Sequence, residues 1–149
     1  MACSFRKIAG KCGANPKASG QVGTCVLLSE CDKDVTCHLK SMKVSEPNAS
    51  EEVDLILSRA GVYDFKGTRS LKRNLIICPS HRGSLGINWR RNSAKCSVPR
   101  ELSKHTPRKG DRGLNWHQVR IIYMKCGIHI PVGSGSCFLI FNVSFCCCY

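Results

Sequence analysis

The sequence predicts a small α+β fold with two short helices, a small antiparallel sheet and much irregular structure. Two segments carry apolar residues at helical spacing, and two short apolar runs have the composition of strands. The segments between them are rich in Gly, Pro, Ser and basic residues and show no regular period, which is typical of irregular backbone.

The first predicted helix covers residues 51–60. Ser50 has the chemistry of an N-cap, and Gly61 suits the left-handed position that often ends a helix. Four apolar residues recur at helical spacing and form one stripe, which we expect to face the core. The stripe consists of Val53, Ile56, Leu57 and Ala60.

The second predicted helix covers residues 114–126, with Asp111 near its start and Gly127 as its C-cap. Val119, Ile122, Tyr123 and Cys126 form its apolar stripe. Strands are expected at 75–77 and 128–132. Pairing these two strands would bring Cys137 towards Cys78.

A short motif, Cys78-Pro79-Ser80-His81, follows the apolar run at 75–77. Two intervening residues let a thiolate and an imidazole face one centre from a tight turn, and Pro79 fixes part of the turn backbone. A strand that leads into a Cys-x-x-His turn is how a zinc knuckle is built. The motif therefore predicts half of a zinc site.

The second half of the site is expected to include Cys137, which follows a glycine-rich segment. A ribbon-type partner would come three residues later, but that residue is Ile140, which cannot bind a metal. Cys96 and His105 offer the sulfur and nitrogen donors that suit zinc. The prediction is one closed, near-tetrahedral site, in which Cys146 from the tail is an alternative ligand.

Four other cysteines, Cys12, Cys25, Cys31 and Cys37, are spaced more loosely than the usual zinc knuckle. We interpret them as scattered structural thiols, and a second zinc site that includes them is the alternative. Accordingly, Cys78→Ser is expected to remove the metal, whereas Cys3→Ser is not. Chelation is expected to unfold residues 75–137 and to affect the helix near 51–60 less.

Residues 75–137 resemble a Cys/His-rich module that occurs in uncharacterised predicted proteins of invertebrate animals. The shared pattern comprises Cys78-Pro79-x-His81-Arg82, Leu85-Gly86, Trp89-Arg90-Arg91, Cys96, Val98-Pro99, Leu102-Ser103, His105, Asp111-Arg112-Gly113, Ile130-Pro131-Val132-Gly133-Ser134-Gly135 and Cys137. The family's closing segment is similar to Cys-Arg-x-Cys, so Ile140 stands where the module has its second cysteine. The resemblance implies no particular activity.

Positive charge is concentrated in the middle of the chain. Residues 1–65 carry eight basic and eight acidic side chains, whereas residues 66–112 carry thirteen basic and two acidic ones. Such a block attracts polyanions, which favours nucleic acid or an acidic protein as partner, although a solvated face would have the same composition. The candidate contacts, with Trp89 as a stacking surface, are Arg73, Arg82, Trp89, Arg90, Arg91, Lys95, Arg108, Lys109 and Arg112.

The twelve cysteines raise the question of a secreted, disulfide-rich protein. The first residues lack the apolar region of a signal peptide, so we expect reduced thiols and an intracellular location, with the nucleus as one candidate compartment. No apolar run is long enough to span a membrane. Secretion stays an alternative, because Asn48-Ala49-Ser50 and Asn142-Val143-Ser144 are glycosylation-type triplets.

Three regions are expected: a loose Cys-containing segment over 1–49, a zinc-stabilised domain over 50–137, and an apolar Cys-rich tail over 138–149. The abrupt change at the tail also fits a truncated gene product without stable activity. No signature of a phosphate loop, nucleophile elbow or catalytic metal site occurs in the sequence. The sequence therefore favours a non-enzymatic, zinc-stabilised binding module.

Overall fold

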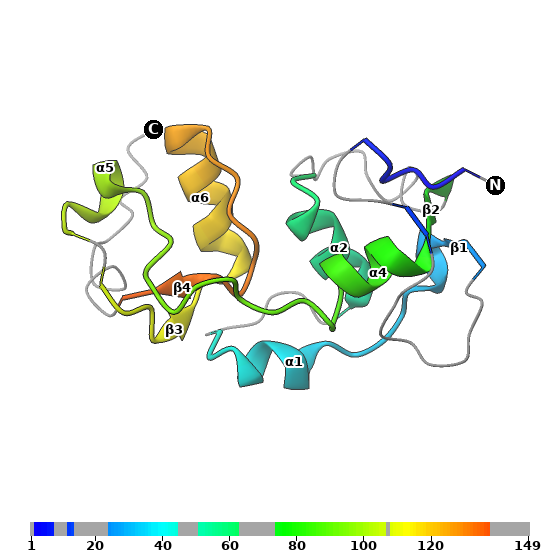
Figure 1. Ribbon diagram of the computed structural model, residues 1–149, viewed down its shortest axis with the longest axis horizontal. Coiled ribbons are helices and arrows are strands. Elements are labelled where there is room, and N and C mark those ends of the chain that lie inside the picture. Colours follow the sequence, from blue (N-terminus) through cyan, green and yellow to red (C-terminus); the bar gives the residue numbers. More distant parts are fainter. Residues whose placement is uncertain are drawn as a thin grey trace. The chain divides into compact units, whose positions relative to one another are not determined.

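The computed structural model describes residues 2–7, 12–13, 24–44, 51–62, 74–106 and 108–137. These residues form five α-helices and two small antiparallel two-stranded sheets, with much irregular backbone between them (Figure 1). The predicted α+β class is therefore confirmed. The chain divides into two compact units: unit 1 comprises Met1–Val35 and Ala49–Arg90, and unit 2 comprises Thr36–Asn48 and Arg91–Tyr149.

The sheet of unit 1 pairs β1 (Val26–Leu27) with β2 (Ile76–Ile77) in antiparallel register. The 3-10 turn η1 (Leu28–Glu30) continues β1, and its first N–H donates to the carbonyl of Leu75 at 2.7 Å. The strand expected at 75–77 is present as β2, but the prediction that it pairs with residues 128–132 is wrong. β1, which is only two residues long, takes that place.

Two helices of unit 1, α2 (Glu52–Arg59) and α4 (Pro79–Leu85), contact each other. The buried carboxylate of Glu52 accepts hydrogen bonds of 2.9 and 2.6 Å from the Arg82 guanidinium. A buried charge needs such a partner, because removing it from water is costly. The helix predicted at 51–60 is α2, although its N-cap is Glu51, and Ser50 lies outside the described residues.

The Cys-x-x-His motif was expected to form a tight turn, and this expectation is wrong because α4 begins there. Cys78 is the extended N-cap residue, and Pro79 takes the first helical position. Proline suits that position, since its fixed φ matches the helix and its missing N–H would have no helical partner anyway. Cys78 and His81 are therefore held by a helix rather than by a flexible turn.

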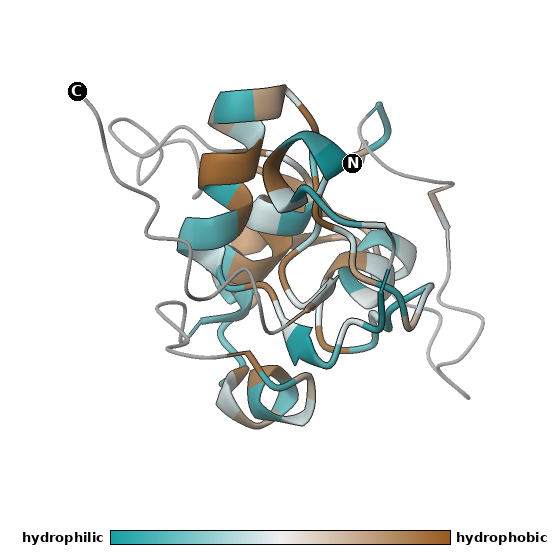
Figure 2. Cartoon of the chain, turned by 90° about the vertical axis from the view of Figure 1, so that its left-hand side faces the viewer, coloured by the Kyte–Doolittle hydropathy of each residue, from teal (hydrophilic) through white to brown (hydrophobic). Residues whose placement is uncertain are grey.

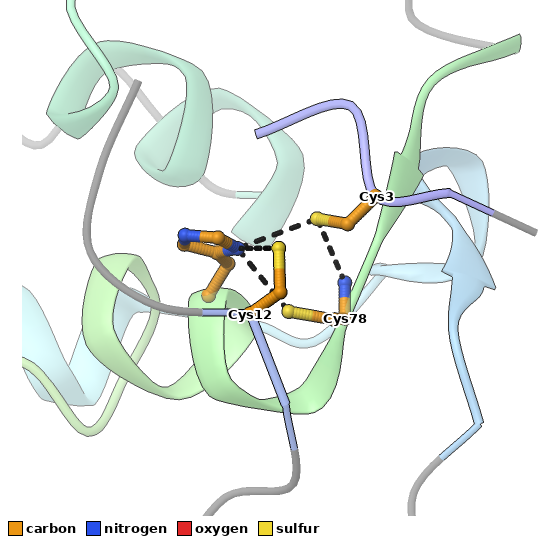
Figure 3. Close-up of side chains that lie close together, drawn as sticks. Cys3, Cys12 and Cys78 are labelled. Atoms are coloured by element: carbon orange, nitrogen blue, oxygen red, sulfur yellow. Dashed lines mark hydrogen bonds between the residues drawn. The ribbon is translucent and has the colours of Figure 1, made fainter. Parts of the chain in front are cut away.

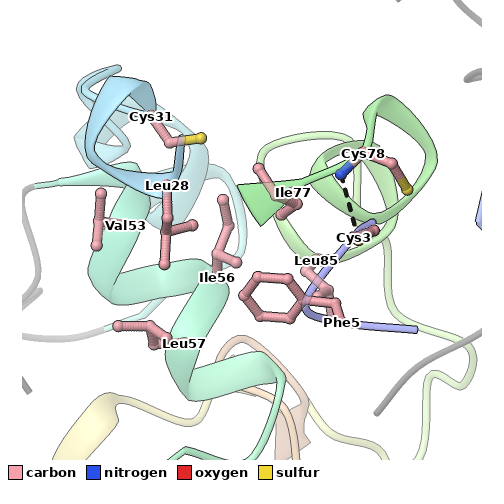
Figure 4. Packing of buried hydrophobic residues seen from close by; sticks show 10 residues of the cluster. All are labelled: Cys3, Phe5, Leu28, Cys31, Val53, Ile56, Leu57, Ile77, Cys78 and Leu85. Atoms are coloured by element: carbon pink, nitrogen blue, oxygen red, sulfur yellow. Dashed lines mark hydrogen bonds between the residues drawn. The ribbon is translucent and has the colours of Figure 1, made fainter. Parts of the chain in front are cut away.

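Apolar side chains from α2, α4, both strands and the N-terminal segment form the core of unit 1 (Figure 4). Phe5, Leu28, Ile56 and Ile77 have at most 1% of their surface exposed. Cys31 is also in this core, and burial raises the pKa of its thiol to about 11. Cys31 therefore packs as a core residue of unit 1.

This core divides the chain differently from the boundary expected at residue 49. Phe5 and Leu28 belong to the same hydrophobic cluster as Ile56 and Leu85, so the N-terminal residues are part of a folded unit. Helix α1 (Thr36–Ser41), by contrast, belongs to unit 2. The apolar tail over 138–149 lies outside the described residues.

Unit 2 is built around α6 (Trp116–Cys126) and a sheet of β3 (Arg112–Gly113) and β4 (Gly135–Ser136). Asn115 and Gln118 form a capping box at the start of α6, and Gly127 ends it with φ 67°. The helix predicted at 114–126 is thus confirmed in place. Figure 2 shows apolar and polar residues alternating along α6, and its buried face is narrower than expected, since Tyr123 is 42% exposed.

Residues 128–132 do not form the expected strand. Ile128 and His129 are exposed, and Pro131 has no N–H to donate to a ladder. The chain then turns at Gly133, where φ is 93°, and its N–H donates to the carbonyl of Leu114 at 2.9 Å. Strand pairing starts only after this turn, at β4. The short helix α5 (Arg100–Ser103) completes the unit.

Candidate metal centres

Centre 1 consists of Cys3, Cys12, Cys78 and His81, whose ligand atoms all lie within 4.8 Å of one another. The Nδ1 atom of His81 lies 3.2 Å from the sulfur of Cys78, 3.3 Å from that of Cys3 and 3.8 Å from that of Cys12. Figure 3 shows the three sulfur atoms converging from separate stretches of chain. Three thiols and one imidazole could hold one metal ion.

Local structure explains how two of these ligands meet. Cys78 and His81 lie on one side of α4, at its N-cap and in its first turn. The N-terminal segment is fastened to β2, because the Ser4 N–H donates to the Ile76 carbonyl at 2.8 Å and the Ile76 N–H donates to Ser4 Oγ at 3.0 Å. Cys3 is thereby placed beside Cys78, whose N–H donates to its sulfur at 3.4 Å.

The electrostatics of centre 1 separate its thiols. Although burial acts against it, hydrogen bonds from the backbone of Gly13 and His81 lower the pKa of Cys78. Loss of water and the neighbouring Cys3 and Cys78 sulfurs raise the pKa of Cys12 to about 11. Burial lowers the pKa of His81, so the imidazole is neutral at pH 7, as a metal ligand must be.

Centre 2 consists of Cys96, His105 and Cys137. The Nε2 atom of His105 lies 2.8 Å from the sulfur of Cys137. Its Nδ1 atom lies 2.6 Å from the carbonyl oxygen of Thr106, to which it can only donate. This contact fixes the proton on Nδ1 and turns the lone pair of Nε2 towards the thiol, which is how metal-binding histidines are commonly oriented.

Three segments of unit 2 meet at centre 2. The Cys96 N–H donates to the Arg108 carbonyl at 2.6 Å, and the Ser97 N–H donates to the Gly135 carbonyl at 2.8 Å. The second contact requires glycine, because a Cβ on Gly135 would lie 2.9 Å from the Lys95 carbonyl oxygen. Cys137 follows β4 directly and is buried.

The structure therefore corrects the single site predicted from sequence. Cys78 and His81 meet Cys3 and Cys12 in unit 1, while Cys96, His105 and Cys137 form a separate group in unit 2. Sequence reasoning missed Cys3 and assigned Cys12 to the structural thiols. No short motif marks this pair, since His81 follows Cys3 by 78 positions and Cys12 by 69. Ile140 and Cys146 lie outside the described residues.

None of the nine cysteines within the described ranges forms a disulfide. Of these, Cys31 lies in the core, and Cys37 is exposed on α1. The cysteines of both centres therefore form no disulfides and could bind a metal.

Several of the residues expected to contact polyanions are engaged within their own unit. Arg82 pairs with Glu52. The Arg91 guanidinium donates to the carbonyls of Gly133 at 2.7 Å, Gly110 at 3.0 Å and Met42. Such contacts tie loop segments together and leave little of the guanidinium for a phosphate.

Trp89 also has an internal partner, because the Arg59 guanidinium carbon lies 4.3 Å from the centre of its ring. Burial, with a smaller effect of Arg90, lowers the pKa of Arg59 to about 9, so the side chain is still a cation at neutral pH. Arg90 is exposed and donates to the carbonyls of Ile87 and Trp89. Arg73 lies outside the described residues.

Four other predicted contacts, Lys95, Arg108, Lys109 and Arg112, are exposed in unit 2. The described residues of unit 1 include six basic and six acidic side chains, and those of unit 2 include eleven basic and two acidic ones. Unit 2 therefore carries the net positive charge of the described residues.

Comparison with known proteins adds no relative: no family model, curated protein or solved structure matches this chain. Among the described residues, no helix is both long and apolar enough to cross a membrane.

Proposed function

We propose that this protein is a non-enzymatic, zinc-stabilised binding module whose basic unit 2 binds nucleic acid. The observation that carries the proposal is the convergence of Cys3, Cys12, Cys78 and His81 within 4.8 Å. Three thiolates and one imidazole are a common donor set of structural zinc sites, and soft sulfur ligands select zinc over magnesium or calcium.

The distances at centre 1 support zinc. With zinc–sulfur bonds of about 2.3 Å and zinc–nitrogen bonds of about 2.0–2.1 Å, a tetrahedral site separates sulfur and nitrogen by roughly 3.6 Å. The distances of 3.2, 3.3 and 3.8 Å bracket this value. Four protein ligands fill a tetrahedral site and leave no position for a substrate, which favours a structural role.

Metal analysis of the purified protein tests this part of the proposal. We expect at least one tightly bound zinc per chain, and cobalt substitution should give the intense visible absorption of tetrahedral thiolate coordination. Well under one zinc per chain after purification with zinc in the medium would overturn the zinc proposal. Thiols of this kind persist in reducing compartments, so we propose an intracellular location.

The charge of unit 2 supports nucleic acid as the partner. Eleven basic residues against two acidic ones give a surface that phosphates neutralise with release of counterions. Fluorescence anisotropy with a short labelled DNA duplex should therefore show affinity that falls linearly with salt on logarithmic axes. Absence of salt-dependent binding would overturn this part of the proposal. Equal binding of polyglutamate would identify an acidic protein as the better partner class.

A further inference from the structure

We propose that Lys95 and Lys109 form a phosphodiester-binding site, here termed the cationic ladder, and that a metal ion at centre 2 holds this ladder in shape. The inference rests on the proposed function, since it names the contact surface and its control. Both side chains are exposed in unit 2.

The ladder is defined by backbone pairing. Lys95 and Lys109 are directly opposite each other in an antiparallel bridge. The flanking hydrogen bonds run from the Cys96 N–H to the Arg108 carbonyl at 2.6 Å and from the Gly110 N–H to the Ala94 carbonyl at 2.7 Å. This pattern makes the lysines a non-hydrogen-bonded pair, the class in which opposite Cα atoms are only about 4.5 Å apart.

Two like charges directly opposite each other weaken a strand pair. Asp111 offsets part of the repulsion, because its carboxylate lies 3.4 Å from Lys109 Nζ. Both groups are well exposed, at 80% and 58%, so this ion pair contributes little and can yield to a phosphate. An anion bound between the lysines would relieve the repulsion that the fold imposes.

Centre 2 lies on the other side of the same backbone. Successive side chains of an extended segment point to opposite faces, so Lys95 and Cys96 face opposite ways. Lys95 is exposed, and Cys96 meets His105 and Cys137. A metal ion bound by these three residues would join both sides of the bridge to the end of β4. The repulsion between the lysines could then no longer separate their strands.

The first arm of the test measures binding of the full-length, zinc-loaded protein to a labelled DNA duplex over a range of salt concentrations. Lys95→Gln with Lys109→Gln should lower affinity and reduce the salt slope by about two, roughly one per lysine. The matched control, Lys40→Gln with Lys43→Gln, removes the same charge from α1 and the turn after it in unit 2. Its salt slope should stay close to that of the parent. Equal slopes for the two double variants would overturn the ladder.

The second arm separates the two centres. Cys96→Ser should lower the bound zinc at centre 2 and weaken DNA binding, and added zinc should not restore it. Cys12→Ser should lower the zinc at centre 1 and leave DNA binding within about twofold, since unit 1 carries no net charge among its described residues. Hydrogen exchange at the amides of residue 96 and of Gly110 reports the bridge directly in each variant.

The two proposals fail in different ways. If Cys96→Ser empties centre 2 but DNA binding stays at the parent level, the proposal that the metal holds the ladder in shape is overturned. The proposed function then still stands. No salt-dependent binding by the zinc-loaded parent overturns the proposed function itself. A Cys96→Ser protein that keeps its full zinc content would overturn the proposal that a metal ion at centre 2 holds the ladder in shape.

Discussion

The thiols of this protein fall into distinct chemical classes according to their immediate surroundings. Cys31 is sealed in an apolar core with a pKa of about 11, whereas Cys78 shares its hydrogen bonds with His81 and Gly13, and its pKa is lowered. Spacing along the chain does not reveal these classes, because burial and partner groups determine them.

Cys3→Ser should reduce the zinc content by about one equivalent per chain, contrary to what the sequence alone indicates. The variant removes a sulfur that lies 3.3 Å from His81 Nδ1, and a serine oxygen is a poor replacement for a zinc thiolate. Metal analysis after dialysis measures the loss. Cys37→Ser, at an exposed thiol of α1, is the matched control and should keep its zinc. An unchanged zinc content in Cys3→Ser would remove Cys3 from centre 1.

Cys31 should resist alkylation in the folded protein. With a pKa of about 11, only about one thiol in ten thousand is ionised at pH 7, and 0% of the residue is exposed. Cys37 should react readily under the same conditions. Brief treatment with iodoacetamide, followed by peptide mass spectrometry with and without denaturant, compares the two. Rapid native labelling of Cys31 would show that the core of unit 1 opens easily.

Among the elements, those with a repeating pattern and a clear end were predictable. Helices α2 and α6 were found in the sequence because apolar residues recur at helical spacing before Gly61 and Gly127. Helix α4 was missed, since Cys78-Pro79-Ser80-His81 fits a turn equally well and only packing against α2 selects the helix. Two residues are too few to show an alternating pattern, so the pairing of β1 with β2 could not be predicted from the sequence.

Asn115→Ala should destabilise unit 2 by about 1 kcal/mol, because it removes the N-cap acceptor of α6. The Asn115 side chain accepts from the Gln118 N–H at 2.9 Å, and the Gln118 side chain accepts from the Asn115 N–H at 2.9 Å. Urea unfolding followed by circular dichroism measures the change in the free energy of unfolding. Asn92→Ala, at an exposed position of the same unit, should change it much less.

At the scale of the whole molecule, each unit has its own candidate centre, and this arrangement changes the expected effect of chelation. Helix α2 was expected to be affected less than residues 75–137 when the metal is removed. It packs against α4, which carries His81, and its Glu52 pairs with Arg82 of the same helix. Loss of metal from centre 1 should therefore loosen α2 as well.

Hydrogen exchange with mass spectrometry, before and after addition of a chelator, should show lost protection in α2, α4 and β2 together. In Cys96→Ser, where only centre 2 is altered, α2 should keep its protection until the chelator is added. Protection of α2 that survives chelation in the parent protein would show that the apolar core, rather than the metal, holds unit 1.

The sequence could not reveal this organisation, because neither unit is continuous. The chain contributes Met1–Val35 to unit 1, Thr36–Asn48 to unit 2, Ala49–Arg90 to unit 1 and the remainder to unit 2. A boundary sought at one position, such as residue 49, cannot describe such an alternation. All five predicted ligands lie in groups that could hold a metal ion, but their partition between two groups follows from tertiary packing alone.

The long separation between Cys3 and His81 in the sequence has a consequence while the chain is being synthesised. Ribosomes add about 5–20 residues per second, so roughly 4–16 seconds pass between the addition of Cys3 and that of His81, 78 positions later. The first thiols of centre 1 are therefore synthesised before their imidazole partner exists. If centre 1 binds zinc as proposed, oxidation of Cys3 or Cys12 during those seconds would leave His81 without a complete set of donors.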